Sequence, residues 1–508
     1  MTEALPRSAA GDRSPWLIAV VVSIATFMEV LDTTIANVAL RHIAGSLAIS
    51  LDESTWILTS YLISNAVVLP ISGWLATVLG RKRFYMSCVA VFTAASFACA
   101  TATSLTWMVT ARLFQGAGGG GLAPTEQAIF ADTFPVRLRA QAFALYGLTV
   151  VCAPVIGPVL GGWLTDNLSW RWVFLINIPM GLLSLTLVHW LVTEPPALQE
   201  DRRRKLHGGL KIDYIGFALV VLGFGTLQVV LDRFDIDDGF GSSLITELAL
   251  VSGVSLVALV IREVLIEHPI VDFRLLARSR AFAIACILML MVGFLLISTT
   301  QLLPQLTQTL LGYDAYQSGL TLGLAGVVTF FAMPVAGIVT GRLIQPKWLI
   351  LIAFAGTGWA LIRASSLDLD ISFWTVSQIR VYQAVWLPFM FIPISAVAYV
   401  GVPADRNNEV SALLNLMRNL GGSAGVSFVN TLLDWRTQFH HERLGEAVTP
   451  YNGYGFGHSL TQIAQAVQNQ ASMLSYLDIF WLLGVIALCI WPVACFLPRM
   501  PKGAVAAH

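Results

Sequence analysis

Charge is scarce in this sequence of 508 residues: only 12% are Asp, Glu, Lys or Arg, whereas 56% are hydrophobic. So low a charge fraction at this length excludes a water-soluble protein of several domains. The charges also balance, with 30 basic and 30 acidic residues, so there is no basic field to attract nucleic acid. These absences leave a polytopic membrane protein that contacts the lipid bilayer and does not bind nucleic acid.

Cysteine is also rare, and catalytic motifs are absent. The six cysteines fall inside apolar segments, and neither they nor the eight histidines have metal-ligand spacing, so we expect no metal site. No polar stretch is long enough for a soluble catalytic domain, and no hydrolase, metalloprotease or P-loop motif occurs. We therefore expect neither an enzyme nor a bound cofactor. The stretch 116–121 fits a dinucleotide motif only formally, and we interpret it as a glycine face for helix packing.

Long apolar runs dominate instead. A membrane-spanning helix needs about 20 mostly apolar residues, and continuous rather than alternating runs exclude a β-barrel. The first run shows no signal-peptide cleavage site, so we interpret it as a retained span. The sequence predicts fourteen spans, at about 16–38, 54–78, 84–102, 105–131, 140–165, 171–193, 212–231, 244–262, 281–303, 316–341, 347–363, 373–400, 409–433 and 476–497.

Lysine and arginine orient these spans. With a cytoplasmic N-terminus, the cytoplasmic segments hold 21 basic residues and the outer loops hold six. The excess of positive charge predicts that both termini are cytoplasmic. The other three basic residues, Arg112, Arg380 and Arg418, lie inside predicted spans.

An internal repeat divides the chain. Arg112-Leu-Phe-Gln115 returns 268 residues later as Arg380-Val-Tyr-Gln383, and three further short matches share this offset. The repeat predicts an all-α membrane fold of two six-helix bundles with two helices inserted between them, and a substrate site near the midplane. The predicted parts are an N-terminal cytoplasmic tail at 1–15, a bundle at 16–193, a linker with the inserted helices at 194–280, a bundle at 281–497 that includes an outer loop at 434–475, and a tail at 498–508.

Two carboxylates, Glu29 and Asp32, lie in the outer half of the first span. An ionisable residue in lipid is costly and marks a candidate functional site. Asp32 and Arg112 lie at similar predicted depths, about 9 and 10 Å below the outer helix ends. The arginine favours a charged Asp32 and burial opposes it, so a change in hydration or distance could load or release a proton. A permanent ion pair that only joins two helices is the alternative.

Glu29 lies on nearly the same helix face as Asp32. It could carry a second proton, attract a cationic substrate or be unessential. Other polar residues within spans must face the bundle interior, where they line a cavity or form interhelical hydrogen bonds. The candidate cavity residues are Glu29, Thr33, Asn37, Gln115, Thr299, Gln301, Asn415, Arg418 and Asn419.

Two glycine-containing segments are candidate gates. The stretch 73–83 ends the second span at the cytoplasmic face, although a basic loop that only sets topology would also explain its charges. The stretch 153–162 should interrupt the fifth span, bend it and pack tightly, as a seal between the halves requires. The candidate gating residues are Gly73, Gly80, Arg81, Lys82, Pro154, Gly157, Pro158, Gly161 and Gly162.

These stretches together with residues 31–39 and Arg112-x-x-Gln115-Gly116 resemble the signature motifs of the major facilitator superfamily. The sequence is similar to the drug:proton antiporter branch of this superfamily, of the EmrB/QacA type, in its fourteen predicted spans and in the stretches 170–179 and 418–422. Within that branch it resembles the EmrB group. The resemblance implies export of small toxic amphiphiles driven by the proton gradient alone. It also implies a bacterial inner membrane, a periplasmic membrane-fusion adaptor and an outer-membrane channel of the TolC type.

One position departs from the superfamily pattern. Thr77 stands where many members have aspartate, so Arg81 needs another partner, and Glu126 and Asp132 are the candidates. Two functional alternatives stay open: a proton-coupled symporter that imports a metabolite, and an exporter that works without an adaptor. The outer loop 434–475 is either a docking surface for the adaptor or a solvated connector.

Overall fold

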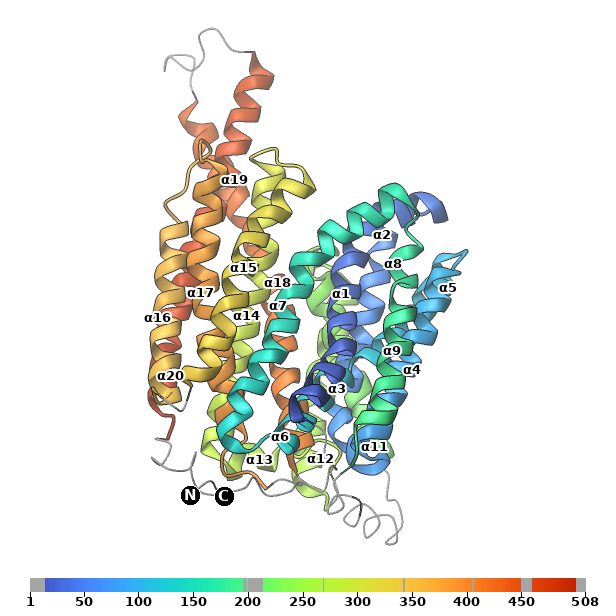
Figure 1. Ribbon diagram of the computed structural model, residues 1–508. Coiled ribbons are helices and arrows are strands. Elements are labelled where there is room, and N and C mark those ends of the chain that lie inside the picture. The colour runs from blue at the N-terminus through green and yellow to red at the C-terminus, as the bar shows by residue number, and fades with distance from the viewer. Residues whose placement is uncertain are drawn as a thin grey trace.

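The computed structural model describes residues 14–194, 199, 213–267, 269–340, 343–403, 406–448 and 459–498. Helices account for nearly all of this part, and its only β-type pairing is an isolated bridge between Thr340 and Ile344. The helices run side by side along one axis, with the first and last described helices beginning and ending at the lower end of Figure 1. We call this the lower end and the opposite one the upper end.

The N-terminal half begins with a long helix that packs on the other helices of its bundle. Its elements are α1 (Pro15–Leu47), α2 (Leu51–Ser54), α3 (Trp56–Leu79), α4 (Arg81–Ala100), α5 (Leu105–Gly119), α6 (Leu122–Thr133), α7 (Val136–Asn167), α8 (Trp172–Leu175) and α9 (Asn177–Leu191).

The C-terminal half follows the inserted elements. These are α11 (Tyr214–Arg233), the short 3-10 helix η1 (Gly239–Gly241), α12 (Ser243–Leu265) and α13 (Arg274–Arg278). The C-terminal helices are α14 (Arg280–Thr309), α15 (Ala315–Val339), α16 (Pro346–Ala364), α17 (Phe373–Ala398), α18 (Asn407–Ala447), α19 (Leu460–Cys489) and α20 (Trp491–Cys495).

Twelve helical stretches of the described part are long and apolar enough to cross a membrane. The predicted spans 105–131 and 409–433 are not among them. The first is divided at Gly120 and Gly121 into α5 and α6, each too short alone. The second lies in α18, whose polar residues lower its mean hydropathy. Fourteen spans therefore remains a prediction, although the chain forms helices in all fourteen places.

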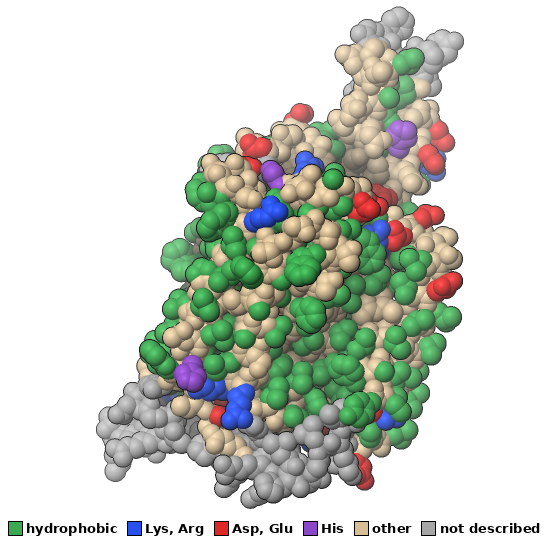
Figure 2. All heavy atoms as spheres, turned by 90° about the vertical axis from the view of Figure 1, so that its right-hand side faces the viewer, with side chains coloured by type: hydrophobic (Ala, Val, Ile, Leu, Met, Phe, Trp, Pro, Cys, Tyr) green, Lys and Arg blue, Asp and Glu red, His purple; other side chains and the backbone are tan. Residues whose placement is uncertain are grey.

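Charged side chains flank an apolar band on the surface. In Figure 2 hydrophobic side chains cover the middle of the visible face, and most charged ones lie above or below it. The apolar residues of α12 are well exposed, with Val254 at 62% and Val257 at 61%. Lipid is the environment that such a band fits, because exposed apolar area of this extent is unfavourable in water.

The segment predicted as the outer loop 434–475 is helical over most of its described length. α18 continues to Ala447 and α19 starts at Leu460, so the two form a helical hairpin that projects beyond the bundle in Figure 1. Ser459 caps α19 in a reciprocal box with Gln462, whose side chain accepts from the Ser459 backbone at 3.0 Å. The Gln-rich residues at the start of α19 are polar, but glutamine is a good helix former and the cap supports the first turn. Residues 451–457 lie outside the described residues.

The prediction that residues 153–162 break a span is wrong, but the predicted bend is present, since α7 changes direction along its length in Figure 1. α7 is one continuous helix that contains both Pro154 and Pro158. The predicted tight packing is present, because a Cβ at Gly157 would clash with Thr34 of α1 and one at Gly161 would lie 3.0 Å from Ile35. A helix can continue through proline when a neighbouring helix supports it closely.

Candidate functional site

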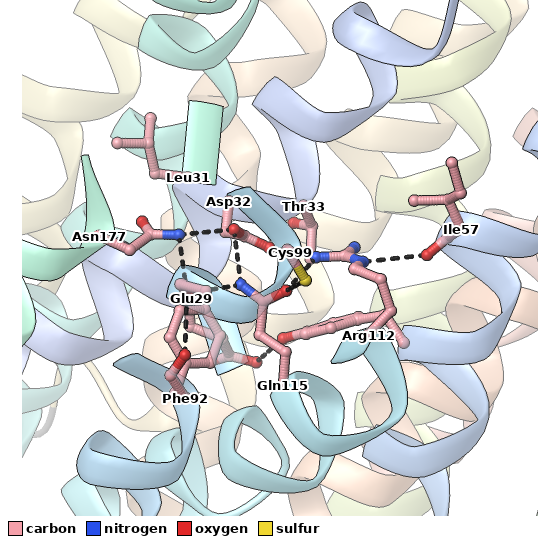
Figure 3. A network of polar contacts seen from close by, with 12 residues as sticks. Glu29, Leu31, Asp32, Thr33, Ile57, Phe92, Cys99, Arg112, Gln115 and Asn177 are labelled. Atoms are coloured by element: carbon pink, nitrogen blue, oxygen red, sulfur yellow. Dashed lines mark hydrogen bonds and ion pairs between the residues drawn. The ribbon is translucent and has the colours of Figure 1, made fainter. Parts of the chain in front are cut away.

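Asp32 is the centre of a buried polar network in the N-terminal half (Figure 3). Its side chain is completely buried. Arg112 Nη1 donates to Asp32 Oδ2 at 2.6 Å, while Gln115 and Asn177 donate to Oδ1 at 2.8 and 2.6 Å. Helices α1, α5 and α9 thus meet at one carboxylate, and the predicted pairing of Asp32 with Arg112 is present.

Arg112 is held on several sides. Its Nε donates to the Ile57 carbonyl at 3.0 Å and its Nη1 to Gln115 Oε1 at 2.7 Å. The guanidinium carbon lies 4.5 Å from the centre of the Tyr61 ring, a cation–π contact. These contacts fix the arginine on α5 and α3, so a relative movement of α1 would change its distance to Asp32.

Glycines bring α5 close enough for these contacts. A Cβ at Gly118 would lie 2.7 Å from the Phe92 backbone nitrogen of α4, and one at Gly120 would lie 2.8 Å from the Asn65 carbonyl of α3. Larger side chains would separate the backbones. The glycine face expected at residues 116–121 is therefore present.

The network surrounds the carboxylate of Asp32 with hydrogen-bond donors and a cation. Each oxygen of Asp32 accepts at least one hydrogen bond, and the adjacent cation supplies the opposite charge. Charge-assisted bonds of this kind are stronger than neutral ones. A proton on Asp32 would weaken all three interactions together, so protonation and the packing of α1 on α5 and α9 are chemically linked.

Sequence reasoning missed Asn177 and Ser96 as members of this site. Asn177 donates to both Asp32 and Ser96, and Gln115 donates to Ser96 at 2.8 Å. The signal for Asn177 was present, since it belongs to the stretch 170–179 that carried the family resemblance. Ser96 offers no such signal, because an isolated serine in an apolar helix is common.

Glu29 is connected to the Asp32 network through Tyr61, which also packs against Arg112 (Figure 3). It accepts hydrogen bonds of 3.3 Å from the Tyr61 hydroxyl and the Asn65 amide, both on α3. Its Oε2 is buried and has no hydrogen-bond partner in the described part of the chain. Asn65, which donates to Glu29, also accepts from Asn419 on α18 of the other half at 3.4 Å. Glu29 therefore faces the interface between the halves.

Three of the predicted cavity residues join the two halves through α18. Asn415 donates to Gln127 at 2.9 Å, Arg418 to the Tyr146 hydroxyl at 2.7 Å, and Asn419 to Asn65 at 3.4 Å. Their partners all belong to the N-terminal half, on α6, α7 and α3 respectively. This row of contacts runs along the interface that also contains Glu29.

The remaining cavity candidates are not brought together. Thr33 is half-buried and donates to the Val30 carbonyl of its own helix at 2.8 Å, while Asn37 is exposed. Thr299 is buried inside the C-terminal half, and exposed Gln301 donates weakly to Asn430 at 3.4 Å. The geometry thus gathers Glu29 with the α18 residues at the interface, places Gln115 in the Asp32 network, and leaves these four elsewhere.

Arg81 finds its partner at the lower end of the molecule. It forms a buried ion pair with Asp132, which also accepts from Asn407 of the other half at 2.9 Å. The other candidate partner, Glu126, instead accepts from Ser23 at 2.5 Å. Thr77, at the position of the missing aspartate, accepts from Asn408 at 3.3 Å.

The remaining gating residues shape the same region. Gly80 has φ of 89°, a conformation that favours glycine, and it joins α3 to α4 directly. A Cβ at Gly73 would lie 3.2 Å from the Asn408 carbonyl, so this glycine admits α18. Lys82 donates to the His189 carbonyl at 2.7 Å, and Gly162 has open space where its Cβ would be.

Two helical halves that meet around buried charges define the class of secondary membrane transporters. Residues 22–426 match the family model of the Major Facilitator Superfamily. The chain belongs to this superfamily, and within it to the EmrB type. No group of three or more possible metal ligands occurs in the described residues.

Relatives of known name cover almost the whole chain. The multidrug export protein EmrB of Escherichia coli K12 is 34% identical over 96% of both chains. The fatty acid resistance protein FarB of Neisseria gonorrhoeae is 32% identical over 93% of this chain and 94% of its own. The structure of the proton:xylose symporter XylE covers 96% of this chain and 97% of its own, with a TM-score of 0.61 and 15% identity. It bears on the fold alone.

Proposed function

We propose that the protein is a proton-coupled antiporter that exports toxic amphiphilic compounds across the inner membrane of a bacterium. The observation that carries this proposal is the completely buried Asp32, held by donors from two other helices. A carboxylate in this setting can exchange a proton only when its surroundings change. The names of the EmrB and FarB relatives support multidrug or fatty acid export as the task.

Proton binding at Asp32 would alter how α1 packs. The neutral acid would attract Arg112 less, and the bonds from Gln115 and Asn177 would weaken. α1 packs on α7 through Thr34 and Gly157, and α7 packs on α15 through Gly147 and Met333. This path connects the proton site to the interface at which the halves would rock against each other.

The excess of basic residues in one set of loops supports cytoplasmic termini, so the lower end would face the cytoplasm. Stacking of Phe143 on Tyr399, with ring centres 5.4 Å apart, joins the halves near this end. The Arg81, Asp132 and Asn407 contacts do so as well. This arrangement is consistent with a state that is closed to the cytoplasm, in which substrate leaves outward.

The proposal is tested by efflux of a fluorescent amphiphile from proteoliposomes with a defined proton gradient. We expect Asp32→Asn to abolish proton-driven efflux, because the amide cannot titrate. Asp166→Asn is the matched control, since Asp166 is 68% exposed at the end of α7. Normal, gradient-driven efflux by Asp32→Asn would overturn the proposal. Inward accumulation of the probe together with protons would instead favour the symporter.

We further propose that the α18–α19 hairpin binds a periplasmic adaptor, which would connect the exporter to an outer-membrane channel of the TolC type. The hairpin is held at its base by Arg436, which donates to Asp478 at 2.7 Å. Its exposed Trp435 (67%) and Phe439 (44%) offer aromatic contacts.

Efflux from whole cells separates the adaptor-dependent exporter from the independent one. Trp435→Ser with Phe439→Ser should reduce resistance in cells and leave efflux from proteoliposomes unchanged. Equal loss in both assays would show damage to transport itself. Full resistance in cells would contradict the docking role.

A further inference from the structure

The C-terminal half contains a structural counterpart of the Asp32 site. Arg112 Nη1 donates to Gln115 Oε1 at 2.7 Å, and 268 residues later Arg380 Nη1 donates to Gln383 Oε1 at 2.7 Å. Each arginine belongs to the fourth long helix of its half and contacts the first. These helices are α5 and α1 for Arg112, and α17 and α14 for Arg380. The sequence repeat is therefore preserved in side-chain geometry.

The counterpart lacks the carboxylate. The same offset places Thr300 where Asp32 stands in the N-terminal half. Within the described part of the chain Arg380 donates only to neutral oxygens: to Thr299 at 3.2 Å, to Gln383 and to Thr300 at 2.7 Å. Gln383 donates to Thr299 at 2.6 Å, as Gln115 does to Asp32. No acidic residue of the described chain forms an ion pair with Arg380.

Arg380 is thus an uncompensated buried cation. It is 9% exposed, and its Nε has no hydrogen-bond partner among the described residues. Burial of an unpaired charge is strongly unfavourable, so proteins normally supply an opposite charge. Arginine cannot become neutral by losing its proton. A negative charge from outside the described chain would remove this cost.

We infer that Arg380 binds the negatively charged group of a small ligand, either the carboxylate of an organic acid or an inorganic monovalent anion. The unpaired Nε and the adjacent Nη2 form the edge of the guanidinium that matches a carboxylate. Thr300 is only partly buried and the next residue, Gln301, is exposed, so the cluster lies near an accessible part of α14.

Anion binding at Arg380 does not depend on the proposed transport activity. The assignment of this anion as a transported acid does rest on proton-coupled export. In that case Asp32 would handle the proton in one half, and Arg380 would hold the charged group of the substrate in the other. The exporter would then accept anionic amphiphiles as well as neutral ones.

The test measures thermal unfolding of the purified full-length protein in detergent, in sulfate buffer without chloride. Benzoate, benzyl alcohol and chloride are titrated separately. We expect benzoate to raise the unfolding midpoint of the wild type, and Arg380→Gln to weaken its apparent affinity roughly tenfold or more. Benzyl alcohol should act equally on both. An equal effect of chloride would identify a general anion site, and its absence a carboxylate site.

Thr300→Asp provides a second test that does not remove the arginine. It supplies the carboxylate that the N-terminal half has, so it should raise the unfolding midpoint without ligand and abolish the benzoate shift. Arg363→Gln, at an exposed arginine of α16, is the matched control and should leave the shift unchanged. An undiminished benzoate shift in Thr300→Asp or in folded Arg380→Gln would overturn the inference. Because no proton gradient is used, these results are independent of whether Asp32 couples transport.

Discussion

Asp32 and Arg112 form a 2.6 Å ion pair in which both side chains are completely inaccessible to solvent. The two residues are 80 positions apart in the chain and belong to α1 and α5. At this depth each charge depends on the other, since neither has water to stabilise it. The pair therefore holds α1 and α5 together when Asp32 is ionised, and this contact is weaker when Asp32 carries a proton.

Removal of the arginine alone should be costly. We predict that Arg112→Gln lowers stability by about 3–5 kcal/mol, because Asp32 would remain buried with no opposite charge. The double variant Asp32→Asn with Arg112→Gln should recover a large part of this loss, since neither charge remains. Thermal unfolding in detergent of the four proteins of this double-mutant cycle provides the measurement. Additive losses would contradict the pairing.

The packing of α7 on α1 should be sensitive to a single methyl group. Gly157→Ala would place a Cβ against Thr34, whereas Gly162→Ala would meet nothing within 4 Å. We predict a loss of about 1–3 kcal/mol for the first variant and a change within about 0.5 kcal/mol for the second. Unfolding midpoints of the two variants decide this, and equal midpoints would refute the close approach.

The Arg81 and Asp132 pair should help to keep the lower end closed. We predict that Arg81→Gln increases labelling of Ala412→Cys by a water-soluble maleimide several-fold, in a variant without the native cysteines. Ala412 is 2% exposed on α18, between the lower contacts of the two halves. Arg83→Gln is the control, because Arg83 is exposed. Unchanged labelling in Arg81→Gln would show that other contacts suffice.

A carboxyl pair at the upper end should make stability depend on pH. Burial and the neighbouring carboxyl of Asp434 raise the pKa of Asp235, in the loop after α11, to about 6. The folded protein therefore holds more protons than the unfolded chain between about pH 4 and 6. The contact is favourable at low pH, and this contribution is lost as the pH rises through about 6.

Asp235→Asn isolates this effect. We predict that the variant is more stable than the wild type at pH 7.5 and that the difference decreases steadily as the pH falls from about 6 to about 4. Asp238→Asn, an exposed residue of the same loop, should show no such dependence. Unfolding midpoints across this pH range give the comparison, and parallel curves for wild type and Asp235→Asn would contradict it.

Much of the N-terminal site follows from local rules. A charged residue in an apolar helix needs a partner, so Asp32 and Arg112 identify each other by depth alone. The neutral residues around this pair do not require a charged partner. Ser96 and Asn177 are neutral, and an isolated neutral residue in an apolar span has many possible neighbours. The sequence therefore predicted the ion pair but not the full set of donors to Asp32.

The helix boundaries show the same division. Apolar length predicts a span without knowledge of its neighbours, and the described helices agree with this prediction in most places. Whether Pro154 and Pro158 break α7 depends on support from α1, and whether Gln-rich residues continue α19 depends on the cap at Ser459. Those are interactions between segments or at helix ends, which hydropathy does not record.

By itself the sequence determined the membrane environment, the repeat and the principal charged pair, because composition, periodicity and charge in lipid are properties of single segments. Its motifs also carried the resemblance to the family. Only the tertiary structure decided that Asn177 completes the Asp32 site, that Arg81 pairs with Asp132 and not Glu126, and that the partners of Arg380 in the described chain are neutral. These outcomes depend on which of several polar groups, distant in sequence, reach within about 3 Å of each other. That choice is made by the packing of whole helices.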